Sequence, residues 1–139
     1  MHTLVLFGQA GSWKSIAHEI ARRFDKMHRL TSSFIFLKEQ SEGRQLEGEA
    51  YHLFTTVARD LSDRYPSLFK PALGRVIKDN SSLRLRTRDC PMLFKSLVLE
   101  PLKHLHIVDP ILVVIDALDE SGDVTGGNGL HEFLAKKPL

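Results

Sequence analysis

The chain has 139 residues, which is about one domain's worth and excludes a multidomain enzyme. Hydrophobic residues make up 42% of it and charged residues 26%, so a packed core can form and neither the disordered nor the low-complexity class is favoured. The formal net charge of +2 does not favour a nucleic-acid partner.

The cysteine content and the apolar runs indicate the cellular location of the protein. Cys90 is the one cysteine, so no internal disulfide can form, and a zinc site of paired cysteines and histidines is not indicated. The apolar runs at residues 4–7 and 111–115 are far shorter than the roughly 20 residues that span a bilayer. We therefore expect a cytoplasmic protein without a membrane partner.

The first third of the chain predicts a strand, a glycine loop, a helix and a second strand. Residues 3–7 are apolar and stop at Gly8, which is typical of a strand buried on both faces of a parallel sheet. From Lys14 onward the apolar residues recur at helical spacing. Residues 31–37 are again strand-like, and the helix before them is long enough for the crossover between parallel strands. Two side chains of this second strand, Phe34 and Phe36, are expected in the core.

The rest of the chain predicts helices followed by one more strand. Residues 38–48 are polar and are expected to form a loop, and helical patterns cover residues 50–63, 66–78 and 89–103. The apolar residues 111–115 then run into Asp116 as a third strand. A loop rich in glycine and acid and a short amphipathic tail, residues 130–139, come last. This tail is too short for a further crossover and strand, so we expect three strands.

A broken phosphate-binding motif lies between the first predicted strand and helix. Residues 8–15 read GQAGSWKS, against the pattern G-x-x-x-x-G-K-[ST], in which backbone N–H groups and a helix N-terminus cradle phosphates. Gly8, Lys14 and Ser15 fit the pattern. Trp13 stands where a glycine is expected, because the backbone must approach the phosphate closely there. The alternative is an ordinary glycine-containing turn before a helix.

A second motif supports the first. Asp116 follows an apolar strand and precedes Ala-Leu-Asp-Glu, as does the Mg²⁺-holding acid that accompanies the phosphate loop in nucleoside triphosphatases. Ligands of open α/β sheets bind at the carboxyl ends of the strands, which is where this acid stands. Taken alone, Asp116 could simply cap the next helix. Both motifs in the right order favour a nucleotide site.

At this point the sequence resembles a known family. The segments LVLFGQAGSWKSIAHEIARRF, TSSFIFLKEQ, LVLEPL and ILVVIDALDE, in that order, look like the NACHT-type P-loop region of fungal NOD-like receptor (STAND) proteins. The same region is described as a nephrocystin-like N-terminal domain. Members are signal-transduction ATPases that switch between a closed monomer and a signalling oligomer. The resemblance therefore implies ATP and Mg²⁺ as cofactors, and self-association or other signalling proteins as partners.

The resemblance assigns roles to particular residues. The residues that it places around the phosphates are Gly8, Gln9, Ala10, Gly11, Ser12, Trp13, Lys14 and Ser15. Ser15 and Asp116 match the metal-associated hydroxyl and acid, and Asp119 or Glu120 matches the acid that orients or activates the attacking water. Trp13 departs from the family's glycine, which predicts impaired binding of the triphosphate.

The expected fold is a P-loop NTPase-like three-layer α/β/α arrangement with a mostly parallel sheet truncated to about three strands. We expect one partial domain over residues 1–139, with a phosphate-loop half (1–37), a helical stretch (38–108) and an acidic second motif with a short tail (109–139). In the family a further strand lies between the two motif strands. Its omission, together with Trp13, predicts that ATP hydrolysis is weak or lost.

Three functions remain open from the sequence. The first is a nucleotide-binding module that binds ATP with Mg²⁺ and hydrolyses it slowly or not at all. The second is a non-catalytic interaction scaffold or a non-functional fragment. The third is a small P-loop metabolite kinase, which is disfavoured because the chain leaves no length for an acceptor site and a lid.

Overall fold

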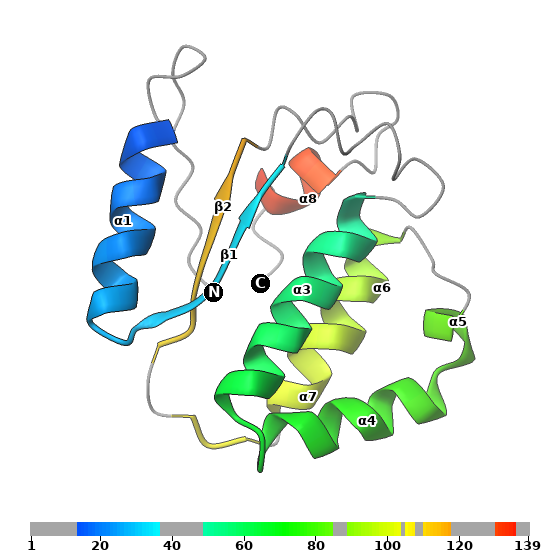
Figure 1. The fold of residues 1–139 in the computed structure, drawn as a ribbon. Coiled ribbons are helices and arrows are strands. Elements are labelled where there is room, and N and C mark those ends of the chain that lie inside the picture. Colours follow the sequence, from blue (N-terminus) through cyan, green and yellow to red (C-terminus); the bar gives the residue numbers. More distant parts are fainter. Residues whose placement is uncertain are drawn as a thin grey trace.

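The computed structural model describes residues 14–36, 49–84, 89–103, 105–107, 110–117 and 130–135, which form a mixed α/β and mostly helical fold (Figure 1). The elements in chain order are α1 (Lys14–Lys26), β1 (Leu30–Ile35), α3 (Glu49–Arg64), α4 (Phe69–Asp79), α5 (Ser81–Arg84), α6 (Cys90–Phe94), the π-helix η1 (Lys95–Leu99), α7 (Glu100–Lys103), β2 (Leu112–Asp116) and α8 (Leu130–Ala135). The strand predicted at residues 3–7 and the loop predicted at residues 38–48 lie outside the described residues.

Helix α1 forms where the helical spacing predicts it. Its partly buried apolar residues are spaced three or four apart along one face of the helix. They are Ala17, Ile20, Ala21 and Phe24. Ile16 and Met27 extend the same apolar pattern but are 40% and 53% exposed. The helix ends in a Schellman motif, since Arg29 N–H donates to the Phe24 carbonyl and His28 has a left-handed φ of 54°.

The two described strands form a parallel pair. Strand β1 lies beside β2 in a register that brings Phe34 opposite Ile115, with an irregularity near the start of β1, between Leu30 and Ser32. Phe34 and Phe36 point to the same face and are 9% and 1% exposed, so the prediction that both are core residues is confirmed. The strands predicted at residues 31–37 and 111–115 are therefore present, each shifted by about one residue.

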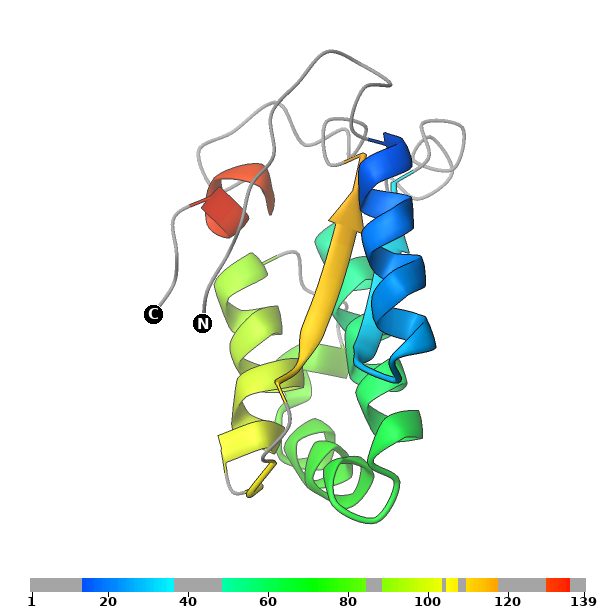
Figure 2. The same cartoon turned by 90° about the vertical axis from the view of Figure 1, so that its left-hand side faces the viewer.

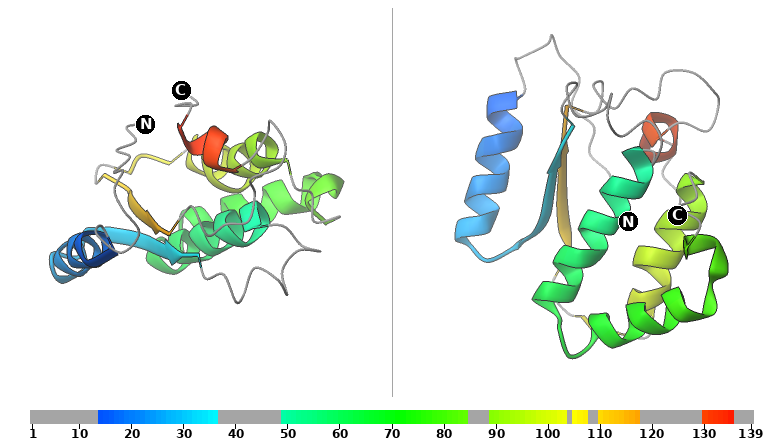
Figure 3. Two further views of the ribbon diagram at one scale, coloured as in Figure 1. Left: turned by 90° about the horizontal axis from the view of Figure 1, so that it is seen from above. Right: turned by 45° about the vertical axis from the view of Figure 1, so that its right-hand side comes forward.

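Helices lie on both sides of this strand pair. Helix α1 packs against one face and α3 against the other, and α6, η1 and α7 lie on the same side as α3 (Figure 3). Polar contacts fix the α3 layer to β1: Ser32 Oγ donates to Asp60 Oδ2 at 2.6 Å. At the end of α3, Arg64 donates to the carbonyls of His28 and Leu30, so α3 also holds the turn between α1 and β1.

The core is centred on α3. Its buried hydrophobic side chains, spaced for one helical face, are Leu53, Phe54, Val57, Ala58 and Leu61. Phe54 also meets Phe94 and Phe133 in a cluster of three rings with centroids 5.6 to 6.0 Å apart. This separation suits edge-to-face and tilted aromatic packing, and it joins α3, α6 and α8.

The helix predicted at residues 89–103 is present but contains a π-helical turn. It begins at an N-cap, Asp89, whose side chain accepts from Met92 N–H. The turn η1 closes when Glu100 N–H bonds to the Lys95 carbonyl. Pro101 accounts for it, because in a regular α-helix proline would have no N–H to donate to the Leu97 carbonyl and its ring would clash with that carbonyl.

Other boundaries differ modestly from the predictions. Helix α4 begins at Phe69 rather than Pro66, since Pro66 and Leu68 lie in the turn after α3. The short helix α5 was not expected. Helix α8 covers the first part of the predicted tail. The described residues include no helix that is long and apolar enough to cross a membrane.

Candidate functional site

The N-terminus of α1 and the carboxyl ends of both strands lie at the same end of the fold. Both strands run in one direction and α1 runs the opposite way, as Figures 1 and 2 show. Helix α1 also packs on β2, although residues 27–111 separate the two in sequence. This end of a parallel sheet is where α/β folds bind their ligands, because loops and helix N-termini converge there.

Asp116 is the last residue of β2 and lies at this end. Its backbone carbonyl accepts from Phe36 N–H at 3.2 Å, which ties the end of β2 to the residue after β1. Its side-chain Oδ1 accepts from Ala117 N–H at 2.7 Å. The other oxygen, Oδ2, is buried and has no hydrogen-bond partner within the described part of the chain. Within the described part of the chain, the carboxylate is thus hydrogen-bonded through Oδ1 alone.

Ala117 has a left-handed backbone that the sequence did not reveal. Its φ is 55°, a conformation that costs an ordinary residue roughly 1–2 kcal/mol. This backbone turn accompanies the bond from Ala117 N–H to the carboxylate of the residue before it. The small side chain lies half-buried against the core. Alanine carries no sequence signal for a positive φ, so only the structure could identify this residue.

The structure places the other predicted site residues as follows. Lys14 and Ser15 are the first two residues of α1, at the end of the helix nearest the strand ends. The first turn of α1 carries no acidic residue, and the N–H groups and dipole at a helix N-terminus favour an anion. The remaining predicted residues lie outside the described part of the chain: Gly8, Gln9, Ala10, Gly11, Ser12, Trp13, Asp119 and Glu120.

The chemistry of Asp116 fits a divalent cation such as Mg²⁺. This ion prefers oxygen ligands and is usually held by one or two carboxylates, with waters and phosphate oxygens completing the shell. A buried carboxylate oxygen without a hydrogen bond is costly, and a cation would satisfy it. Among the residues that the structure describes, no three His, Cys, Asp or Glu side chains gather into a metal cluster. Asp116 is therefore the carboxylate that the described residues place at this end of the strands.

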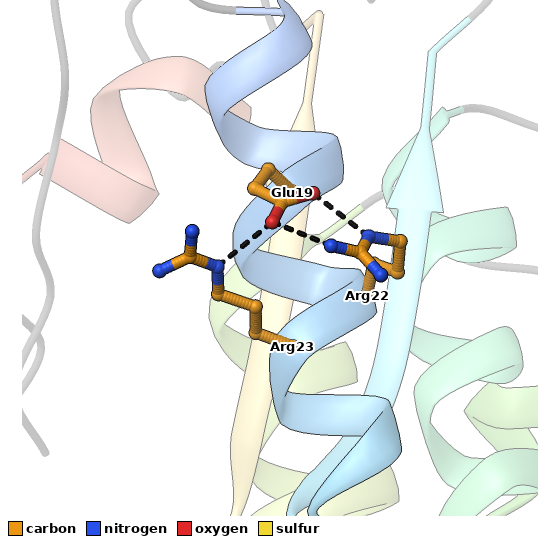
Figure 4. A network of polar contacts seen from close by, with 3 residues as sticks. All are labelled: Glu19, Arg22 and Arg23. Atoms are coloured by element: carbon orange, nitrogen blue, oxygen red, sulfur yellow. Dashed lines mark hydrogen bonds and ion pairs between the residues drawn. The ribbon is translucent and has the colours of Figure 1, made fainter.

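Farther along α1 an exposed ion-pair network stiffens the helix. Glu19 accepts from Arg22 at 2.7 and 2.8 Å and from Arg23 at 2.8 Å, as Figure 4 shows. The hydrogen bonds from Arg22, and then those from Arg23, lower the pKa of Glu19 to about 2. The same contact raises the pKa of Arg22. The network lies on the solvent side, where it supports the helix rather than the strand ends.

An apolar groove lies elsewhere on the molecule. Its volume is about 620 Å³, and its lining includes Pro91, Phe94, Leu99 and Leu102 of the α6–α7 helix and Phe133 of α8. Neither α1 nor the strands contribute to it. The groove is therefore separate from Asp116 and from the start of α1.

Comparisons with known proteins place the chain in a family. No curated protein and no solved structure matches it. A family model described as "Nephrocystin 3, N-terminal" matches residues 1–137, nearly the whole chain. This confirms the resemblance to the nephrocystin-like N-terminal domain. The chain belongs to the nephrocystin 3 N-terminal family.

Proposed function

We propose that the chain is the ATP-binding module of a NACHT-type signal-transduction NTPase, Mg²⁺-dependent and cytoplasmic, built on a P-loop NTPase-like three-layer core. Hydrolysis by it is weak or lost. The observation that carries the proposal is Asp116, a strand-end carboxylate at the same end of the fold as the start of α1, with one buried oxygen that has no hydrogen-bond partner among the described residues.

The arrangement of α1 and β2 supports a phosphate site. Lys14 and Ser15 open a helix whose first turn has no acid, and the strand that ends in Asp116 packs beside that helix. Phosphates bind at such helix N-termini because the N–H groups and the dipole favour negative charge. A lysine at this point reaches the β- and γ-phosphates, and a hydroxyl and a carboxylate are suitable oxygen ligands for Mg²⁺.

The residues divide the work in this proposal. Residues 8–13 supply backbone N–H groups to the phosphates, and Lys14 donates to their oxygens. Ser15 and Asp116 hold Mg²⁺, which when bound neutralises charge on the phosphate oxygens. Asp119 or Glu120 orients the attacking water and accepts its proton. Trp13 places a large side chain where backbone must approach the phosphate, so binding is weak and hydrolysis is slow.

Calorimetric titration of the full chain with ATP and Mg²⁺ tests the proposal. We expect weak but saturable binding that is lost in Lys14→Ala and tightened in Trp13→Gly. The matched control is Lys26→Ala, the same substitution at the opposite end of α1, which leaves binding unchanged because that residue lies away from the strand ends.

The outcomes separate the candidate functions. Absence of binding by both the natural chain and Trp13→Gly would reject the nucleotide module and favour an interaction scaffold. Equal loss in Lys14→Ala and Lys26→Ala would also reject it, because the effect would then reflect general charge. Transfer of the γ-phosphoryl group to a small acceptor would instead identify a kinase.

A further inference from the structure

The α6–α7 helix, residues 90–103, has two apolar faces. One face, which includes Leu93 and Leu97, is buried, and the helix packs against α3 and α4. The other face, which includes Phe94 and Leu99, lines the apolar groove of about 620 Å³ and is only half-buried. An apolar helix face that reaches the surface beside a groove is typical of an interaction surface.

The π-helical turn η1 brings the residues of this second face together. Phe94 and Leu99 both line the groove, although residues five apart would lie about 140° apart around a regular α-helix. In η1 the Glu100 N–H bonds to the Lys95 carbonyl, five residues earlier, so residues at this spacing come to the same side of the helix. Phe133 of α8 forms the wall of the groove beside Phe94, with ring centroids 5.6 Å apart.

The length of the groove suits a helical segment. Along the α6–α7 helix its lining begins at Pro91 and ends at Lys103, which corresponds to roughly 18 Å at a rise of about 1.5 Å per residue. An amphipathic helix that docks in a groove uses apolar side chains three, four and seven residues apart, over two to three turns. The groove offers an apolar surface of that length.

The charges in the groove favour an acidic occupant. Lys95 and Lys103 line it and are exposed, and Glu100 between them lies 3.7 Å from the Lys103 ammonium group. Residues 70–103, which include this helix, hold eight basic and three acidic side chains. Electrostatic complementarity therefore favours a partner with acidic side chains. The two lysines stand roughly 12 Å apart along the helix axis, so acids two turns apart on the partner would match them.

The segments of this chain outside the described residues do not combine acidic groups with an apolar helix face. Residues 1–13 and 136–139 contain no Asp or Glu. Residues 37–48 and 118–129 are acidic, but each holds only two large apolar residues, and both are interrupted by glycines, which disfavour a helix. The complementary segment must therefore come from another protein.

We propose that the groove along the α6–α7 helix binds an acidic amphipathic helix of a partner protein. The apolar face of the partner packs on Phe94, Leu99 and Phe133, and its acids meet Lys95 and Lys103. Neither α1 nor the strands contribute to the groove, so this interaction surface is independent of the proposed nucleotide site.

Fluorescence anisotropy with labelled synthetic peptides tests the inference on the full chain. The probe is a helical peptide of roughly 16 residues with leucines along one face and glutamates two turns apart beside them. One comparison peptide has lysines in place of the glutamates, and another has serines in place of the leucines. We expect saturable binding of the probe, binding of the lysine peptide weaker by about tenfold or more, and no binding of the serine peptide.

Charge reversal in the groove provides the variant. Lys95→Glu combined with Lys103→Glu should weaken binding of the glutamate peptide by about tenfold or more and strengthen binding of the lysine peptide. Lys26→Glu combined with Lys70→Glu is the matched control, because it changes the net charge equally at exposed lysines that do not line the groove. At physiological salt, where charges are screened within about 8 Å, the control should keep both affinities within about twofold of the natural chain.

Several outcomes would overturn the inference: no binding of the glutamate peptide by the natural chain, equal binding of the glutamate and lysine peptides, binding of the serine peptide, or equal losses in the two double variants. Sedimentation that shows a dimer of the natural chain, abolished by the groove variant, would identify a second copy as the occupant and would overturn it as well. The proposed function is judged separately by the Lys14-dependent binding of ATP.

Discussion

Glu19 is an ionisable residue whose contribution to the stability of the fold depends on pH. Arg22, and to a lesser extent Arg23, lower its pKa from 4.5 to about 2 by hydrogen bonding. A carboxyl group whose pKa is lower in the folded chain stabilises the fold above its unfolded pKa, and that contribution disappears as the pH falls toward the folded pKa. The stabilisation is therefore complete at neutral pH and declines between about pH 4.5 and about pH 2.

Glu19→Gln is expected to destabilise the chain slightly at pH 7, because an exposed ion pair contributes little. The difference in urea midpoint from the natural chain should stay constant near neutral pH and narrow as the pH falls from about 4.5 toward about 2. Sodium chloride at about 1 M should also narrow it at pH 7, because screening then acts within about 3 Å. A difference that is constant across pH would show that the glutamate acts through packing or helix propensity instead.

The two residues at the end of β2 show what the sequence can and cannot indicate. An apolar run that stops at an acid predicts that Asp116 ends a strand, because a buried strand tolerates a carboxylate only at its end, and this is confirmed. The left-handed backbone of Ala117 has no such signal, since alanine, unlike glycine, asparagine or aspartate, is not enriched in that region. The hydrogen bond from Ala117 N–H to Oδ1 of Asp116 depends on the backbone and side-chain torsions of Asp116, so it could not be predicted either.

At the scale of elements, amphipathic periodicity predicts where helices form, but it does not predict irregular turns within them. The periods predict α1, α3 and most of α4, because burying one apolar face is what stabilises a helix in a protein. The π-helical turn η1 was missed, because a proline indicates a break or a kink but not which hydrogen bonds replace the lost one. The start of α6 at Cys90 agrees with the helical pattern predicted from residue 89, and the structure adds that Asp89 caps it.

Asp89→Ala is expected to destabilise the chain by about 1 kcal/mol, since the Met92 N–H loses its side-chain acceptor at the helix start. Asp89→Asn is the matched control: asparagine caps as well as aspartate but lacks its charge, so it should retain most of the stability. Urea unfolding of the three proteins measures both effects. If asparagine costs as much as alanine, charge rather than capping is what stabilises the start of α6.

At the scale of the whole molecule, α3 is the element on which the other layers depend. It packs on β1, on α4 and on the α6–η1 helix, and Phe54 reaches Phe133 of α8. The parallel pairing of β1 with β2 joins two segments separated by residues 36–111, and α1 closes the other face. The sequence predicted these strands but not which of them are neighbours, because pairing between distant segments depends on packing that local patterns do not encode.

Because α3 joins these layers, truncating its core should weaken the strand pair as well as the helices. Leu61 is fully buried, and Leu61→Ala should destabilise the chain by about 2–5 kcal/mol through lost burial and the cavity left behind. Leu68→Ala, at a leucine that is 50% exposed in the turn after α3, is the matched control and should change stability by less than about 0.5 kcal/mol.

Hydrogen exchange should show faster exchange in Leu61→Ala at the amide of Phe36, which donates to Asp116 across the strand pair. Faster exchange confined to the helices would contradict this, and it would mean that the two strands and α1 are stable independently of the α3 core.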